Sequence, residues 1–194
     1  MRILFCNITW MEKYNGVVDR NKLKNGGSWV NENNDAMEKN NFTERNGYYR
    51  GYVSTGSNRD KINQIRIERL EGVSKNDDKA EDVLVVWVAK NPKGSGSRVV
   101  GWYKNATVLR HRDEEDKTSI IAKKGNCFLL PEEERLGDKW MVPRANTDGY
   151  GMGQSNIWYG KKDNEKSNNF INEMYERINS YHDKISKVNK SCNI

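Results

Sequence analysis

The sequence has few of the residues on which metal sites and disulfide frameworks depend. Its 194 residues include three cysteines and two histidines. The cysteines, Cys6, Cys127 and Cys192, are far apart, and none belongs to a CxxC pair. A disulfide framework and a zinc site both need clustered ligands, so this spacing disfavours both. Three isolated thiols favour a reduced protein of the cytoplasm, and we expect neither a metal nor another cofactor.

The two histidines have no clear catalytic partner. His111 lies between two arginines at the end of a predicted strand, and His182 lies on the apolar stripe of a predicted helix, where packing is the expected role. No serine or cysteine is paired with a histidine by pattern, as nucleophilic catalysis would require. A metal-dependent nuclease of the restriction type would need an acid two residues before Lys90, and none is there. We therefore expect no catalytic residue in this chain.

Long apolar runs are also missing. No stretch approaches the roughly 18 apolar residues of a membrane span, and the apolar run at 2–9 is too short for a signal peptide. A membrane partner is therefore not expected. Hydrophobic residues make up only 35% of the chain, but six tryptophans and nine tyrosines can bury much area. The net charge of +6 favours a polyanionic partner such as nucleic acid.

The strongest structural signal is a pair of apolar segments. Residues 82–90, DVLVVWVAK, form a β-branched run that is typical of a strand buried on both faces. Residues 98–112, RVVGWYKNATVLRHR, predict a second strand, joined to the first through a seven-residue turn. Gly101 and the pair Lys104 and Asn105 interrupt this strand, and a glycine there indicates a bulge or a close approach of another group.

The other segments complete an α+β pattern. Strands are expected at 2–9, 47–53 and 62–70, in two short segments between 118 and 131, and at 157–159, where the glycine-rich segment 149–160 enters a final strand. Residues 164–190 carry apolar side chains at three- and four-residue steps, which predicts an amphipathic helix capped by Ser167 or Asn168. We expect a small, partly closed β-barrel over 1–162. The helix at 163–194 would then pack on the barrel or lead to a missing module.

Aromatic and polar residues adjoin one another at several expected loops and interruptions. Flat aromatic rings stack on bases, and asparagine side chains can read a base edge. For any single tryptophan, packing in the core remains the commoner role. Basic residues along the second central strand are candidates for phosphate contacts, which fix position more than sequence. These basic residues are Arg98, Lys104, Arg110 and Arg112.

Several motifs over residues 1–160 resemble the N-terminal domains of bacterial modification-dependent restriction endonucleases. They are ILFCNITWMEKYNG, NGGSWV, VLVVWVA, VVGWYKNATVLRH and GYGMGQSNIWYG. Their layout is also similar to that of the PUA-like superfamily, which includes the EVE, YTH and SRA-type readers. The resemblance implies that the domain flips a modified base out of double-stranded DNA into an aromatic cage. It would be the specificity part of a restriction system in phage defence, working with a nuclease module or subunit.

The resemblance also assigns residues to the base pocket. It implies that Trp29 is the cage tryptophan, and that the pocket lies at 101–105, opposite Trp29. The other candidates are walls or groups that hydrogen-bond to the base edge: Trp10, Trp102 and Tyr103 as walls, and Ser28, Asn7 and Asn105 at the edge.

Three alternatives stay open. One is an RNA-binding PUA-like module, and another is a nuclease with an unrecognised active site in which Asp82 takes part. The third is a protein-interaction domain that uses the C-terminal helix. Neither the modification that is read nor the choice between monomer and dimer follows from the sequence.

Overall fold

The computed structural model describes residues 1–16, 37–58, 61–62, 64–92, 94, 96–161 and 164–191. The chain divides into two units, Met1–Tyr159 and Gly160–Ile194, which are described separately. Ser28 and Trp29, which the sequence assigns to the base pocket, lie outside the described residues, as does Cys192.

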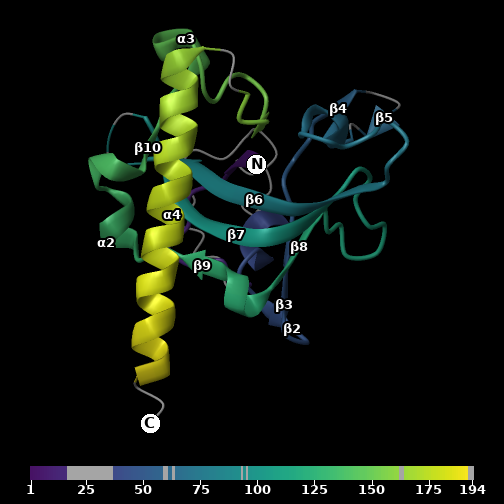
Figure 1. Ribbon diagram of the computed structural model, residues 1–194. Helices are drawn as coiled ribbons and strands as arrows, with labels where there is room; N and C mark the ends of the chain where they lie inside the picture. Colours follow the sequence, from purple (N-terminus) through teal and green to yellow (C-terminus); the bar gives the residue numbers. More distant parts are fainter. Residues whose placement is uncertain are drawn as a thin grey trace. The chain divides into compact units, whose positions relative to one another are not determined.

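The first unit is built on a large, mostly antiparallel sheet (Figure 1). Its described strands follow the order β11-β1-β6-β7-β8-β3-β2, with β9 and β10 also paired to β7. Only β1 and β6 run parallel among these strand pairs. The strands of the sheet are β1 (Arg2–Ile8), β2 (Glu44–Arg45), β3 (Tyr48–Gly51), β6 (Lys79–Lys90), β7 (Ser97–Leu109), β8 (Ile120–Lys123), β9 (Cys127–Leu129), β10 (Met141–Val142) and β11 (Ile157–Trp158).

Short elements connect these strands. A separate hairpin is made by two two-residue strands, and the helices of this unit are one turn long. These elements are β4 (Ser57–Asn58), β5 (Lys61–Ile62), η2 (Met37–Asn40), η3 (Ile67–Arg69), η4 (Lys124–Asn126), α2 (Glu132–Arg135), η5 (Asp138–Trp140) and α3 (Ala145–Asp148).

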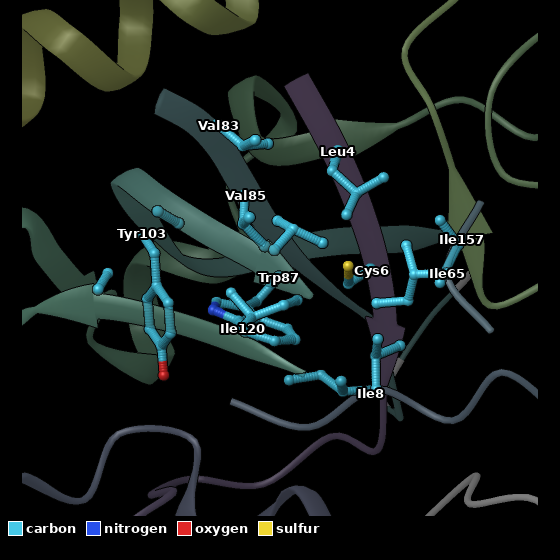
Figure 2. Close-up of a cluster of buried hydrophobic side chains, with 14 of the residues drawn as sticks. Leu4, Cys6, Ile8, Ile65, Val83, Val85, Trp87, Tyr103, Ile120 and Ile157 are labelled. Atoms are coloured by element: carbon cyan, nitrogen blue, oxygen red, sulfur yellow. The ribbon is translucent and has the colours of Figure 1, made fainter. Parts of the chain in front are cut away.

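The strand order confirms the α+β class but gives an open path. Within the described residues, β11 stands at one end of the path and β2 at the other, so backbone pairing does not close the sheet. Side chains from distant positions in this order nevertheless share one core. Figure 2 shows Ile157 of β11 and Ile120 of β8 in the same cluster as Trp87 of β6. The sheet therefore curves around a common interior.

The predicted central hairpin is confirmed. Strands β6 and β7 pair antiparallel and run side by side through the unit (Figure 1). Residues 83–89 are buried throughout, as a β-branched run covered on both faces requires. The pairing shifts register between Trp87 and Val88, beside the expected interruption at Gly101. A Cβ at Gly101 would lie 2.5 Å from the carbonyl oxygen of Phe128, so this glycine allows β9 to approach closely.

Alternation places the side chains of the central strands on two buried faces. Leu4 and Cys6 of β1 meet Val85 and Trp87 of β6 and Tyr103 of β7 on one face (Figure 2). Their neighbours in sequence point to the other face because successive strand residues alternate. There Phe5 stacks on Trp158, with ring centroids 4.6 Å apart.

The strand expected at 62–70 is wrong in its main part. Only Lys61–Ile62 is a strand, and Ile67–Arg69 is a 3₁₀ turn. The backbone amide of Ile67 donates to the carbonyl of Ile65 at 2.9 Å, so the chain turns tightly between the two residues. Ile65 and Ile67 are both buried in the core. A tight turn can bury two apolar residues at i and i+2, and the sequence pattern is then the same as that of a half-buried strand.

The second unit contains the predicted amphipathic helix, α4 (Glu165–Ser191). Its cap differs from the prediction. The side-chain oxygen of Asn164 accepts the backbone amide of Ser167 at 2.9 Å, so Asn164 takes the N-cap position in place of Ser167 or Asn168. The Ser167 hydroxyl instead donates to the carbonyl of Lys161 at 2.6 Å. No helix among the described residues is long and apolar enough to cross a membrane.

Candidate nucleic-acid interface

Two of the predicted cage walls, Trp102 and Tyr103, are core residues. Both side chains are fully buried. Trp102 stacks between Phe128 and Trp140, with ring centroids 5.3 and 5.6 Å away. Tyr103 meets Trp87 edge-on at 5.2 Å, and burial raises its pKa well above the usual tyrosine value. The structure corrects their assignment, because rings enclosed on all sides have no face left for a base.

Trp10 is also packed into the protein. Its side chain is buried, and its indole Nε1 donates to the Glu132 carboxylate at 3.3 Å. The guanidinium of Arg135 lies 5.6 Å from the centroid of the indole ring. These contacts join the end of β1 to α2, so Trp10 serves the fold and does not form an exposed wall.

Arg135 is a buried cation that the sequence analysis did not identify. Its guanidinium donates to the carbonyls of Leu130 at 2.8 Å, Met11 at 2.6 Å and Glu12 at 2.9 Å. Burial lowers its pKa, while the nearby Tyr14 and acidic side chains oppose that shift. Sequence position alone gives no signal of this role, because the residue follows three glutamates in what looks like a solvated turn.

Two of the four predicted phosphate contacts are structural arginines. Arg110 donates to the Glu68 carboxylate at 2.6 Å and to the carbonyls of Asp77 at 2.8 Å and Ser74 at 3.1 Å. Arg98 is 6% exposed and lies 3.8 Å from the Asp138 carboxylate. Their prediction as phosphate ligands is therefore corrected, since buried guanidiniums that bind protein oxygens cannot meet a backbone phosphate.

The remaining predicted residues of β7 and its end are more accessible. Lys104 and Arg112 are half-buried, and Asn105 is exposed. Asn105 has a positive φ of 49° and lies where the β6–β7 register shifts. The structure does not bring Asn105 together with Asn7. Asn7 pairs with Val88, whereas Ala106, next to Asn105, pairs with Val83. Five residues of strand span about 16 Å.

Asn7 belongs instead to a polar network at the carboxyl end of β1. Its Nδ2 donates to Oδ1 of Asn156 at 3.2 Å, and its backbone amide donates to the Asn156 carbonyl at 2.7 Å. Asn156 Nδ2 in turn donates to the carbonyl of Ser54 at 3.1 Å. Both asparagines are half-buried. The network thus holds an amide group in a fixed orientation at a partly open position.

A second pair of polar residues lies at the 3₁₀ turn η2: Glu38 is part of this turn, and Asn41 directly follows it. Asn41 is buried, and its amide clamps the backbone of Tyr52: Nδ2 donates to the Tyr52 carbonyl at 3.0 Å, and Oδ1 accepts the Tyr52 amide at 2.9 Å. Glu38 is 7% exposed. Burial raises the pKa of Glu38 to about 6, outweighing a hydrogen bond from its own backbone amide. No sequence pattern distinguishes either residue from the other polar residues of 35–46.

Backbone hydrogen bonds connect residues 14–16 to residues 39–42, which precede and follow the segment 17–36 in sequence. The amide of Gly16 donates to the carbonyl of Lys39 at 2.9 Å, and the amide of Phe42 donates to the carbonyl of Tyr14 at 2.9 Å. The Tyr14 hydroxyl donates to the Thr9 carbonyl at 2.8 Å. The described residues that flank the segment with Ser28 and Trp29 in sequence are therefore hydrogen-bonded to one another next to Glu38 and Asn41.

The chemistry of this region suits recognition better than catalysis. Asparagine amides offer both a donor and an acceptor, and a carboxylate accepts from an amino group, which are the contacts used on base edges. Among the described residues, no group of three or more His, Cys, Asp or Glu side chains could hold a metal ion. Comparisons with protein-family models, with curated proteins and with solved structures found no match.

Proposed function

We propose that this chain reads a modified base in double-stranded DNA, as the specificity domain of a restriction system that acts in phage defence. The base would leave the duplex and enter beside Asn7, at the carboxyl end of β1. Trp29 and Ser28 stay in the proposal as sequence-based candidates for the cage. Trp102, Tyr103, Trp10, Arg98 and Arg110 no longer belong to it, because they are packed or bonded inside the protein.

The observation that carries the proposal is the oriented amide of Asn7. The Asn156 side chain takes one of its donors, and the Asn156 side chain is itself fixed by the Ser54 carbonyl. Side-chain amides held in this way can test the edge of a flipped base. Beyond Asn7, the carbonyl of Thr9 accepts the Tyr14 hydroxyl and the Tyr14 carbonyl accepts the Phe42 amide, so hydrogen bonds link the end of β1 to residues on both sides of the segment with Trp29. Modified-base readers need these two parts, a stacking ring and an edge contact, close together.

We further propose that the curved sheet is the partly closed PUA-like barrel that the sequence motifs resemble. Its support is the shared core, in which Ile157 of β11 and Ile120 of β8 lie in one buried cluster although three strands, β1, β6 and β7, separate β11 from β8 in the strand order. A domain of this type would work together with a nuclease module or subunit.

A binding panel tests the function. One duplex sequence is prepared unmodified, with modified cytosines and with N6-methyladenine, and the affinities are compared at fixed salt because phosphate contacts make binding salt-dependent. We expect one modification to bind at least tenfold more tightly than the unmodified duplex. Asn7→Ala and Trp29→Ala should each remove most of that preference.

The matched control is Asn76→Ala, which removes an exposed asparagine from a loop of the same unit. It should leave the preference unchanged, and melting temperatures of all variants would show whether they fold. If Trp29→Ala folds and retains full preference for the modified duplex, the cage assignment is wrong. An RNA duplex that binds better than every DNA duplex would favour the RNA-binding alternative.

A further inference from the structure

The sheet has one face on which basic and aromatic side chains gather in register. Arg45 of β2 stands opposite Tyr48 of β3, and Tyr48 stands opposite Lys123 of β8. Residues directly opposite one another in antiparallel strands lie on the same face, about 5 Å apart at Cβ. All three are exposed, and Tyr48 is 41% exposed, among the largest values for an apolar side chain here. We call Arg45, Tyr48 and Lys123 the basic row.

A second row lies next to the first on the same face. Arg50 follows Tyr48 by two residues, so its side chain points the same way. It stands opposite Ile121 of β8, which in turn stands opposite Thr107 of β7. The exposed Asn105 precedes Thr107 by two residues. This face therefore extends from the edge strand β2 to β7.

One acidic side chain is paired with a cation of this face. Arg50 forms an ion pair with Asp116 at 3.3 Å. Although burial opposes the shift, hydrogen bonds from Thr118 and the charges of Arg50 and Arg45 lower the pKa of Asp116. Glu44 alternates with Arg45 and stands opposite Tyr49, so it belongs to the other face. Of the described carboxylates, these contacts bring Asp116 to the face that carries the cations Arg45, Arg50 and Lys123.

The hairpin that presents the basic row is well defined. Asn46 and Gly47 both have positive φ, 53° and 81°, as the two-residue turns that match strand twist require. The Glu44 carboxylate accepts the Gly47 amide at 2.8 Å and holds the turn from the other face. Because the backbone of this hairpin is already ordered, it loses little further freedom when the basic row binds a ligand.

We propose that this face binds the phosphate backbone of the duplex whose modified base enters beside Asn7. This inference rests on the proposed function for the identity of the polyanion. Arg45 and Lys123 supply the charge, and the Tyr48 hydroxyl and ring supply a further contact to phosphate or sugar. Cations separated by strand spacings suit a repeating polyanion, and their charge is complementary to that of phosphate groups.

The covalent chain connects this face to the proposed base site. Asn41, next to Glu38, clamps Tyr52 by two hydrogen bonds, and Tyr52 directly follows β3. Two residues after Tyr52, the Ser54 carbonyl accepts Asn156 Nδ2, and Asn156 Oδ1 accepts Asn7 Nδ2 at the proposed base site. From Tyr48 to Ser54 is six residues, at most about 20 Å of extended chain, which equals about six base-pair steps of B-DNA. The basic row would therefore contact phosphates within about one helical turn of the flipped nucleotide and set its register.

The experiment measures how DNA affinity depends on salt. Each phosphate contact adds about 0.9 to the negative slope of log K against log salt. Arg45→Ala/Lys123→Ala should reduce that slope by about 2 and weaken modified and unmodified duplexes by the same factor, so the preference between them is unchanged. Arg45→Lys/Lys123→Arg keeps both charges and should keep the slope. The matched control, Lys75→Ala/Lys90→Ala, removes the same charge from exposed positions outside the face and should change the slope by less than half as much.

The outcomes separate this inference from the proposed function. If the wild-type chain prefers a modified duplex but Arg45→Ala/Lys123→Ala keeps the full slope, the face does not bind phosphate while the reader function stands. A loss of preference without a change in slope would also overturn it, since the face would then act on the base. If the wild-type chain binds no DNA duplex, or binds an RNA duplex more tightly, both proposals are overturned. Melting temperatures confirm that the variants are folded.

Discussion

Residues 47–50, GYYR, and residues 101–104, GWYK, have the same order of residue types but opposite surroundings. Each stretch has a glycine, two aromatic residues and a cation, and each lies in or beside a strand. In the central strand β7, Trp102 and Tyr103 are both buried. In β3, Tyr48 is exposed and Tyr49 is half-buried. The position of a strand in the sheet, rather than its local sequence, decides whether an aromatic ring can meet a ligand.

The largest expected effect is a difference in the free energy of unfolding between alanine variants of the two stretches. Trp102→Ala should lower the free energy of unfolding by about 3–5 kcal/mol, because it removes a large side chain packed between two other rings. Tyr48→Ala should change it by about 0.5 kcal/mol or less, as is usual for an exposed residue. Urea unfolding checks both values. Equal losses of stability for the two variants would contradict the difference in burial between the two stretches. If Trp102→Ala does not fold, Trp102→Phe gives a smaller loss to measure.

Arginines of the two regions should also differ in how much they stabilise the protein, with the larger loss of stability expected for the buried arginine. Arg110→Ala removes the hydrogen bonds to the Glu68 carboxylate and to the carbonyls of Asp77 and Ser74. We expect a loss of about 2–3 kcal/mol, below the value for a fully buried pair because Glu68 is partly exposed. Arg45→Ala should leave stability nearly unchanged and weaken DNA binding instead. Thermal unfolding and a binding titration on the same samples test this. An Arg110→Ala variant of normal stability with weak DNA binding would restore the original phosphate assignment.

Glu38 gives a smaller effect that depends on pH. Its pKa rises from 4.5 in the unfolded chain to about 6 in the folded protein, so the folded state binds the proton more tightly. The stability from this group is present below pH 4.5 and is lost as the pH rises through about 6. A rise of the Glu38 pKa from 4.5 to about 6 corresponds to about 2 kcal/mol. Glu38→Gln should therefore be more stable than the wild type by about that amount at pH 7, and about equally stable at pH 4.

Glu44 on the exposed hairpin provides the contrast. Its pKa is lowered, first by the Gly47 amide and then by Lys124, so its contribution is present at neutral pH and is lost as the pH falls through the lowered value. Glu44→Gln should be slightly less stable than the wild type at pH 7. Urea unfolding at pH 4 and pH 7 compares both variants with the wild type. If Glu38→Gln is the less stable variant at pH 7, the buried carboxylate has a partner that compensates for its burial.

Periodicity predicted the elements that are governed by one dominant pattern. The run at 83–89 and the stripe of α4 leave one way to bury their apolar side chains, and both were predicted within a few residues. The prediction of a strand around Ile65 and Ile67 was wrong because a tight turn and a strand bury residues at the same spacing. The predicted cap of α4 was wrong because several adjacent polar residues can cap a helix, and the choice depends on where the first turn begins.

The candidate site was less predictable for a different reason. A base contact needs an exposed side chain, and exposure depends on which strands are neighbours. Trp102 and Arg110 have binding-type chemistry, yet their neighbours enclose them. The basic row was missed because its members are distant in sequence and meet only through the β2–β3–β8 register. Asn7 is the predicted edge residue that the structure places in a partly open polar network.

The affinity of the full chain for one duplex, in modified and unmodified forms at the same salt concentration, tests the reader function most directly. We expect at least a tenfold preference for one modified duplex, and we expect Asn7→Ala to remove most of this preference while the salt slope stays the same. Equal affinity for every modified and unmodified duplex would rule out a modified-base reader.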